Sequence, residues 1–124
     1  MLVWSRGQTY ALPDDVLYMA WLILVLAGLC EVTWAVALKY AAGFSRPGPS
    51  AVAIVVMIAS FVLLSFALRS LPLGTAYVVW TGIGAIGTAI LGIVLFHEPA
   101  QALRLLCIGL IIAGVLGLRV LSPG

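Results

Sequence analysis

Charged residues are scarce in this chain. Of its 124 residues, 8% are Asp, Glu, Lys or Arg, whereas 65% are hydrophobic. A soluble domain of this length needs far more polar surface to cover its core, so the composition points to lipid as the solvent. The net charge of +2 is small. It argues against a nucleic-acid partner, which would require a cluster of basic residues.

The residues that usually carry metal or covalent chemistry are also few. The two cysteines, Cys30 and Cys107, both lie inside apolar runs, and there is no CxxC motif and no Cys/His cluster. We interpret them as small buried hydrophobic residues, with no metal site and no disulfide. The sequence has no glycine-rich phosphate loop and no nucleophile–base pair. We therefore expect neither an enzyme nor a cofactor.

Long apolar runs are what the sequence does have. Four segments approach or exceed the roughly 20 residues that cross a bilayer, and we predict helices at about 19–38, 50–68, 73–96 and 103–121. Short connections make consecutive helices antiparallel neighbours. The predicted fold is an all-α integral membrane protein with one four-helix transmembrane domain over 19–121 and a short tail at 122–124.

Residues 1–18 precede the first of these runs. Arg6 is not followed by an apolar stretch of the kind found in a signal peptide, and Asp14 and Asp15 interrupt the approach to the first apolar run. We interpret this segment as an extension of doubtful status, with Met19 a plausible initiator.

Positive charges are balanced between the two predicted membrane surfaces. Arg69 and Arg119 fall on one side, joined by Arg6 if the extension is present. Lys39, Arg46 and Arg104 fall on the other. The positive-inside rule gives no orientation from such a distribution. One interpretation is a weakly biased protein oriented by something else. The other is dual topology, with copies inserted both ways that pair as an antiparallel dimer.

Glu31 is the residue on which the functional hypothesis depends. It lies in the middle third of the first segment, and no Lys, Arg or His lies at a comparable depth in any segment. A carboxylate there costs about 3 kcal/mol on insertion scales, so such groups are usually functional. Burial without a cationic partner disfavours the charged form. One carboxyl that binds either a proton or a cation is sufficient for antiport. The alternative is a protonated carboxyl that only helps packing.

Several residues are expected to surround Glu31. Gly28 leaves space one turn before it, and Trp34 offers an indole N–H and an aromatic face to a cation. The polar tips of Tyr77 and Trp80 need partners inside the membrane, which a carboxylate or a cation would supply. Ser60 can donate to a carboxylate, or back to its own helix. Further pocket-wall candidates are Met57 and Thr81.

Small residues form two further patterns. Gly82, Gly84 and Gly87 lie in the middle of the third segment, where they permit either close packing or a bend between two states. Alternating access requires such an element. Gly109, Ala113 and Gly117 recur every four residues in the fourth segment. This stripe predicts a dimer contact. His97 and Glu98 are interpreted as a solvated turn.

Taken together, these residues resemble the small multidrug resistance transporters from about Ala20 to Leu121. The shared pattern includes Glu31-Val32, Ser60-Phe61 and Gly74-Thr75-Ala76-Tyr77 leading to Trp80. Within the family, the chain is similar to the guanidinium exporters. The features in common with that subtype are Trp34, Met57, Trp80-Thr81-Gly82-Ile83-Gly84-Ala85 and Glu98-Pro99, although His97 replaces a commoner lysine.

The resemblance implies an antiparallel, dual-topology homodimer in the bacterial inner membrane that exports guanidinium-like cations in exchange for protons. It implies that Glu31 binds both substrate and protons, that helix 103–121 forms the dimer contact, and that the carboxylate is oriented by Trp34, Ser60, Tyr77 and Trp80. Guanidinium fits this chemistry, because its planar N–H fork matches a carboxylate. Two alternatives are an exporter of lipophilic quaternary ammonium compounds and a non-transporting membrane assembly subunit.

Overall fold

A computed structural model describes residues 2–5, 8–11 and 13–121 of the chain. Within them, the element order is β1 (Leu2–Ser5), β2 (Gln8–Ala11), α1 (Asp14–Ala41), α2 (Pro47–Ala67), α3 (Leu73–Phe96) and α4 (Ala102–Leu121). All four helices are long and apolar enough to cross a membrane. The prediction of four apolar helices is therefore confirmed. The predicted tail at 122–124 lies outside the described residues.

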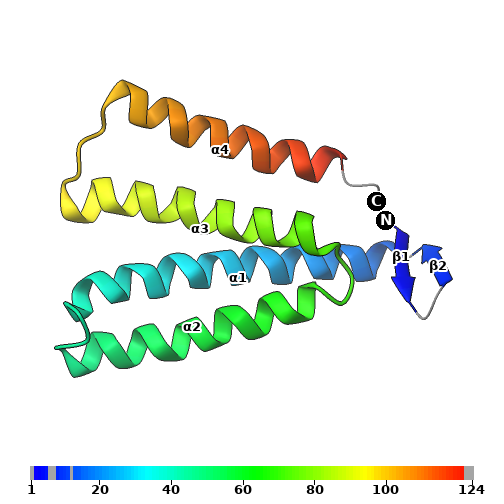
Figure 1. The fold of residues 1–124 in the computed structure, drawn as a ribbon, viewed down its shortest axis with the longest axis horizontal. Coiled ribbons are helices and arrows are strands. Elements are labelled where there is room, and N and C mark those ends of the chain that lie inside the picture. The colour runs from blue at the N-terminus through cyan, green and yellow to red at the C-terminus, as the bar shows by residue number, and fades with distance from the viewer. Residues whose placement is uncertain (1, 6–7, 12, 122–124) are drawn as a thin grey trace.

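Among the described residues, the N-terminal segment contains the one departure from an all-helical fold. Strands β1 and β2 pair as an antiparallel hairpin, with Leu2 opposite Ala11 and Ser5 opposite Gln8. The hairpin lies at the end of the bundle where α1 begins (Figure 1). No strand is predicted here from the sequence.

Helix α1 extends beyond the predicted segment at both ends. It starts at Asp14 rather than Met19, because Pro13 precedes it with a fixed φ and two aspartates, Asp14 and Asp15, fill its first turn. Acidic side chains stabilise the positive end of the helix dipole, so these residues continue the helix instead of ending it. At the other end, Ala42 adopts a left-handed conformation and Gly43 follows with φ 71°. Such residues terminate helices.

The other helices begin where proline permits it. Pro47 occupies the first turn of α2, three residues before the predicted start, and Pro72 immediately precedes α3. Proline is favoured at these positions because the first helical N–H groups have no partner within the helix. Helix α3 ends at Phe96, where His97 takes a left-handed conformation with φ 54°.

Three helices form the core, and the fourth lies to one side. Helix α1 packs between α2 and α3, whereas α4 packs against α3 on the face away from α2 (Figure 1). Small residues bring α1, α2 and α3 close together, and five alanines are fully buried: Ala27, Ala41, Ala53, Ala67 and Ala76. In α4, only Ile108 is buried. Val115 and Leu118 of α4 are partly buried and pack against the core, whereas most of the other apolar side chains of α4 are exposed.

Candidate functional site

Glu31 lies in the contact between α1 and α3. The side chain is half-buried, and a Cβ atom placed on Gly84 of α3 would collide with its carboxyl group. The neighbouring glycines also leave no room for a Cβ atom: one on Gly28 of α1 would collide with Ile83, and one on Gly87 of α3 would collide with Val32. The absence of a side chain at Gly84 is therefore what admits the carboxyl group between the two helices.

The electrostatic surroundings of Glu31 are unusual for a carboxyl group. Its Oε2 atom is buried and has no hydrogen-bond partner. The nearest cation along α1 is Lys39, two helical turns away at the end of the helix. In the described part of the chain there is one ion pair, between Arg104 at the start of α4 and Glu98 in the α3–α4 connection, and it does not involve Glu31. A single chain thus presents a carboxyl group that neither a cation nor a donor satisfies.

A short hydrogen-bonded chain connects the three core helices one turn from Glu31. The Trp80 indole Nε1 donates to the Ser60 hydroxyl over 3.1 Å, and that hydroxyl donates to the Ala27 carbonyl over 2.8 Å. Ser60 is fully buried and Trp80 is 7% exposed. Both polar groups are therefore satisfied within the chain, and they fix the angle between the helices that carry the site. Ser60 bonds to α1, not to its own helix.

Aromatic rings extend this arrangement toward the surface of the chain. Trp80 packs against Tyr77 with 5.6 Å between ring centroids, and against Phe61 edge-on at 5.8 Å. Tyr77 and Phe61 are each about half exposed. Phe61 was not among the predicted site residues. Its position directly after Ser60 could have indicated it, but one more phenylalanine in an apolar helix gives no sign of a special role.

The remaining pocket candidates are less closely connected. Trp34 follows Glu31 by one turn of α1 and is half-buried, and its Nε1 atom is buried without a hydrogen-bond partner. Met57 of α2 is half-buried, whereas Thr81 of α3 is exposed. The structure therefore brings Ser60 and Trp80 together and leaves polar atoms of Glu31 and Trp34 without partners.

The glycines predicted as a hinge all make close contacts. Gly84 faces Glu31 and Gly87 faces Val32, while Gly82 faces Val115 of α4. Helix α3 runs without interruption through all three. In this structure their visible role is close packing, and a bend between two states remains a proposal.

The predicted dimer stripe lies on the open part of α4. Gly109 and Ala113 are exposed and Gly117 is half-buried. A Cβ atom on Gly109 or Gly117 would meet nothing within 4 Å. These small residues therefore do not serve packing within the chain.

The connection between α3 and α4 is a solvent-facing turn. The Arg104 guanidinium pairs with Glu98 at 2.5 Å, and the two side chains are 32% and 43% exposed. Exposed ion pairs contribute little stability. Among the described residues, no group of three or more His, Cys, Asp or Glu side chains is arranged to hold a metal ion.

Comparison with known proteins places these features in a family. The family described as Small Multidrug Resistance protein matches residues 19–111. A protein named guanidinium exporter from Yersinia pseudotuberculosis is 62% identical over 104 residues, which is 84% of this chain and all of that protein. Proteins of the same name from Salmonella typhimurium and Citrobacter freundii are 57% and 56% identical over 101 residues, covering 82% of this chain and 96% of theirs. This chain belongs to the Small Multidrug Resistance protein family.

Proposed function

We propose that this chain exports guanidinium and related small organic cations in exchange for protons, and that Glu31 is the group that binds both. It is a multi-pass protein of the bacterial inner membrane, and a transporter rather than an enzyme. The observation that carries the proposal is the carboxyl group of Glu31, held between α1 and α3 with one oxygen buried and unpartnered.

The mechanism follows from the requirement that a buried carboxylate be neutralised. In the membrane, an uncompensated charge is costly, so Glu31 carries a proton or contacts a cation. Both ligands use the same oxygens, so each displaces the other. A bound cation therefore leaves one side only when a proton replaces it, and this exclusion couples the two fluxes. A planar guanidinium offers paired N–H donors that match the two carboxylate oxygens.

The aromatic groups favour a small, flat, hydrogen-bonding cation. The Trp34 indole N–H lies one turn from Glu31 and lacks a partner, and the rings of Tyr77 and Trp80 provide faces for a delocalised charge. Trp80 is itself held by Ser60. We propose that this frame orients substrate against the Glu31 carboxylate, with Gly28, Met57 and Thr81 shaping the surrounding wall.

We further propose that the working unit is an antiparallel homodimer of dual topology. Four helices enclose little volume for a polar pathway, and the described cations are divided between the two ends of the bundle. Helix α4 packs chiefly against α3 and offers Gly109, Ala113 and Gly117 on its open part. A second copy at this stripe would complete the assembly, and Gly82, Gly84 and Gly87 would permit α3 to bend differently in the two halves.

The test is transport by the purified protein in liposomes, recorded electrically. We expect guanidinium to drive currents that depend on a proton gradient, and Glu31→Gln to abolish them. Glu98→Gln is the matched control, because it makes the same chemical change at an exposed carboxylate in the α3–α4 connection. Wild-type guanidinium binding should weaken as the pH falls, because protons occupy Glu31, whereas any residual binding to Glu31→Gln should not depend on pH.

The same recordings distinguish the alternatives. Tetraalkylated ammonium ions lack N–H donors and would bind by aromatic and apolar contact alone. Currents with these ions and none with guanidinium would favour the lipophilic-cation exporter. Proton-driven currents in Glu31→Gln as large as in the wild type would refute the proposed role of this residue. A folded protein without currents for any cation would favour the assembly subunit.

A further inference from the structure

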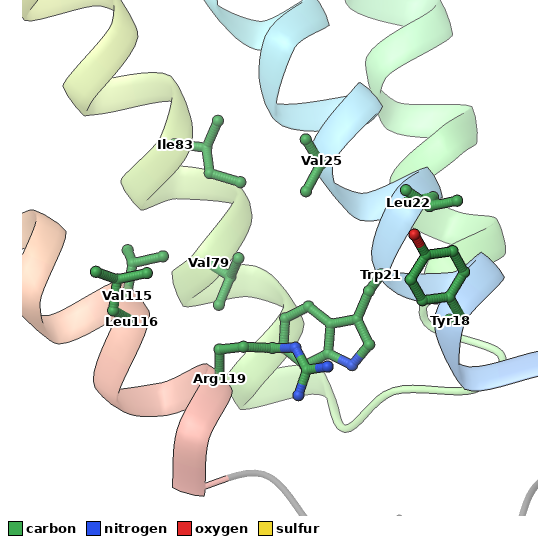
Figure 2. A pocket seen from close by; sticks show the side chains of 9 residues that line it. All are labelled: Tyr18, Trp21, Leu22, Val25, Val79, Ile83, Val115, Leu116 and Arg119. Carbon is green, nitrogen blue, oxygen red and sulfur yellow. The ribbon is translucent and has the colours of Figure 1, made fainter. Parts of the chain in front are cut away.

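A groove runs between α1, α3 and α4 at the end of the bundle where α1 begins and α4 ends (Figure 2). Its volume is about 390 Å³. The walls are apolar and are formed chiefly by Leu22, Val25, Val79, Ile83 and Val115. This groove is separate from the polar contacts of Ser60 and Trp80.

A neighbouring hollow lies next to the groove, farther along α1 and α3. A second apolar hollow of about 430 Å³ lies between α1 and α3, and Ile83 lines both. The α1 residues Leu22, Val25, Leu29 and Val32 follow one another at steps of three and four, so they lie on one helix face. From residue 18 to residue 32 the rise along α1 is about 21 Å. This length is comparable to one leaflet of the hydrocarbon core, about 15 Å, plus part of the interface.

The outer end of the groove carries the cation Arg119, and the acidic first turn of α1, with Asp14 and Asp15, lies one turn before Tyr18. The Arg119 guanidinium lies over the Trp21 ring, 4.7 Å from its centroid, and Tyr18 lies at the rim (Figure 2). Trp21 is 8% exposed and its indole nitrogen has no hydrogen-bond partner. Residues 13–121 form one ion pair, between Arg104 and Glu98 at the opposite end of the bundle. Arg119 therefore has no acidic partner among these residues.

We propose that this groove binds one phospholipid with an anionic head group. An acyl chain lies along the apolar face shared by α1 and α3, and the lipid phosphate pairs with Arg119, with Tyr18 as a second donor. Charge complementarity at one end of the groove and its apolar length at the other favour this ligand. A helix from a second copy would cover the guanidinium with apolar surface and leave its charge without a counterion, which is costly in a membrane. The proposal is independent of the transported cation.

The bound lipid has a structural consequence. Helix α4 packs against α3 and not directly against the backbone of α1. A chain lying against Val25, Val79 and Val115 would contact all three helices and hold α4 in place. Detergent that removes this lipid should therefore loosen α4 before it disturbs the core of α1, α2 and α3.

Native mass spectrometry of the full chain tests the site directly. We expect the wild type to retain phosphatidylglycerol at least fivefold more than phosphatidylcholine, and Arg119→Gln to lose this preference. Arg69→Gln is the matched control. The Arg69 guanidinium also lies over an aromatic ring, 4.9 Å from the centroid of Phe66. The hollow beside it is lined only by residues of α2 and by Arg69 itself, so it offers no groove between helices. Equal retention of the two lipids, or equal losses in both variants, would overturn the proposal.

A second measurement places the acyl chain. Phosphatidylglycerol brominated on its chains should quench the fluorescence of Trp21, measured as the difference between wild type and Trp21→Phe. Brominated phosphatidylcholine at the same fraction should quench this component less. Val25→Phe, which fills the groove without changing charge, should reduce the difference, whereas Val78→Phe outside the groove should not. A Trp21 component that neither lipid quenches would show that protein covers the groove, and would equally contradict the proposal.

Discussion

Adding one methyl group at Gly84 should weaken substrate binding without removing any polar atom. A Cβ atom there would lie 2.8 Å from Cγ of Glu31 and closer still to its carboxyl group. Carbon atoms in contact prefer separations of about 3.5–4.0 Å. The carboxyl group must therefore retreat by about 1 Å, or α1 and α3 must separate.

The magnitude follows from the energetics of overpacking. Inserting a methyl group into a packed contact typically costs about 1–3 kcal/mol. Because this cost displaces the Glu31 carboxyl group that contacts the cation, we expect the affinity for guanidinium to drop by about 5- to 150-fold. The assay is equilibrium binding of guanidinium to purified Gly84→Ala in detergent or bicelles, with transport currents as a second readout.

Gly87→Ala is the matched control for this prediction. It adds the same methyl group one turn along α3, where the collision is with Val32 instead of the carboxyl group. We expect it to lower stability but to leave guanidinium affinity within about twofold to threefold of the wild type, because overpacking away from the carboxylate has no direct effect on the cation. If Gly84→Ala binds as tightly as the wild type, or Gly87→Ala loses as much affinity, the proposed contact does not set the position of Glu31.

Two further outcomes are expected. Ser60→Ala removes the acceptor of the Trp80 indole N–H and should lower the free energy of unfolding by about 1–3 kcal/mol in a denaturant titration. Ser65→Ala, at an exposed position of the same helix, should have little effect. Equal stabilities of the two variants would show that this hydrogen bond does not hold the helices together. Gly109→Leu should reduce dimer crosslinking in detergent, while Gly114→Leu, equally open but on another face of α4, should not; unchanged yields in both would exclude the stripe as the contact.

The location of the key carboxyl group could be predicted from the sequence, but its neighbours could not. Glu31 stands out because it is the single acid in four apolar segments, a fact that needs no coordinates. Its packing against Gly84 depends on how α1 is rotated against α3. The apolar residues surround each helix on all sides, so periodicity gives little information about which face meets which neighbour.

The polar residues illustrate the same limit. Ser60 and Trp80 could be singled out from the sequence, since polar groups inside a membrane helix require partners. In the structure they bond to each other and to the Ala27 carbonyl, and the Oε2 atom of Glu31 remains without a partner. The pairing depends on distances between three helices that lie far apart in the sequence.

The sequence by itself determined the four membrane helices, the family and the identity of the buried acid, because these depend on composition and local order along the chain. The tertiary structure decided the peripheral position of α4 and the groove that ends at Arg119. The physical reason is that lipid and protein interior are both apolar. Hydropathy therefore specifies that a helix enters the membrane, while side-chain shape and a few polar contacts determine what it packs against.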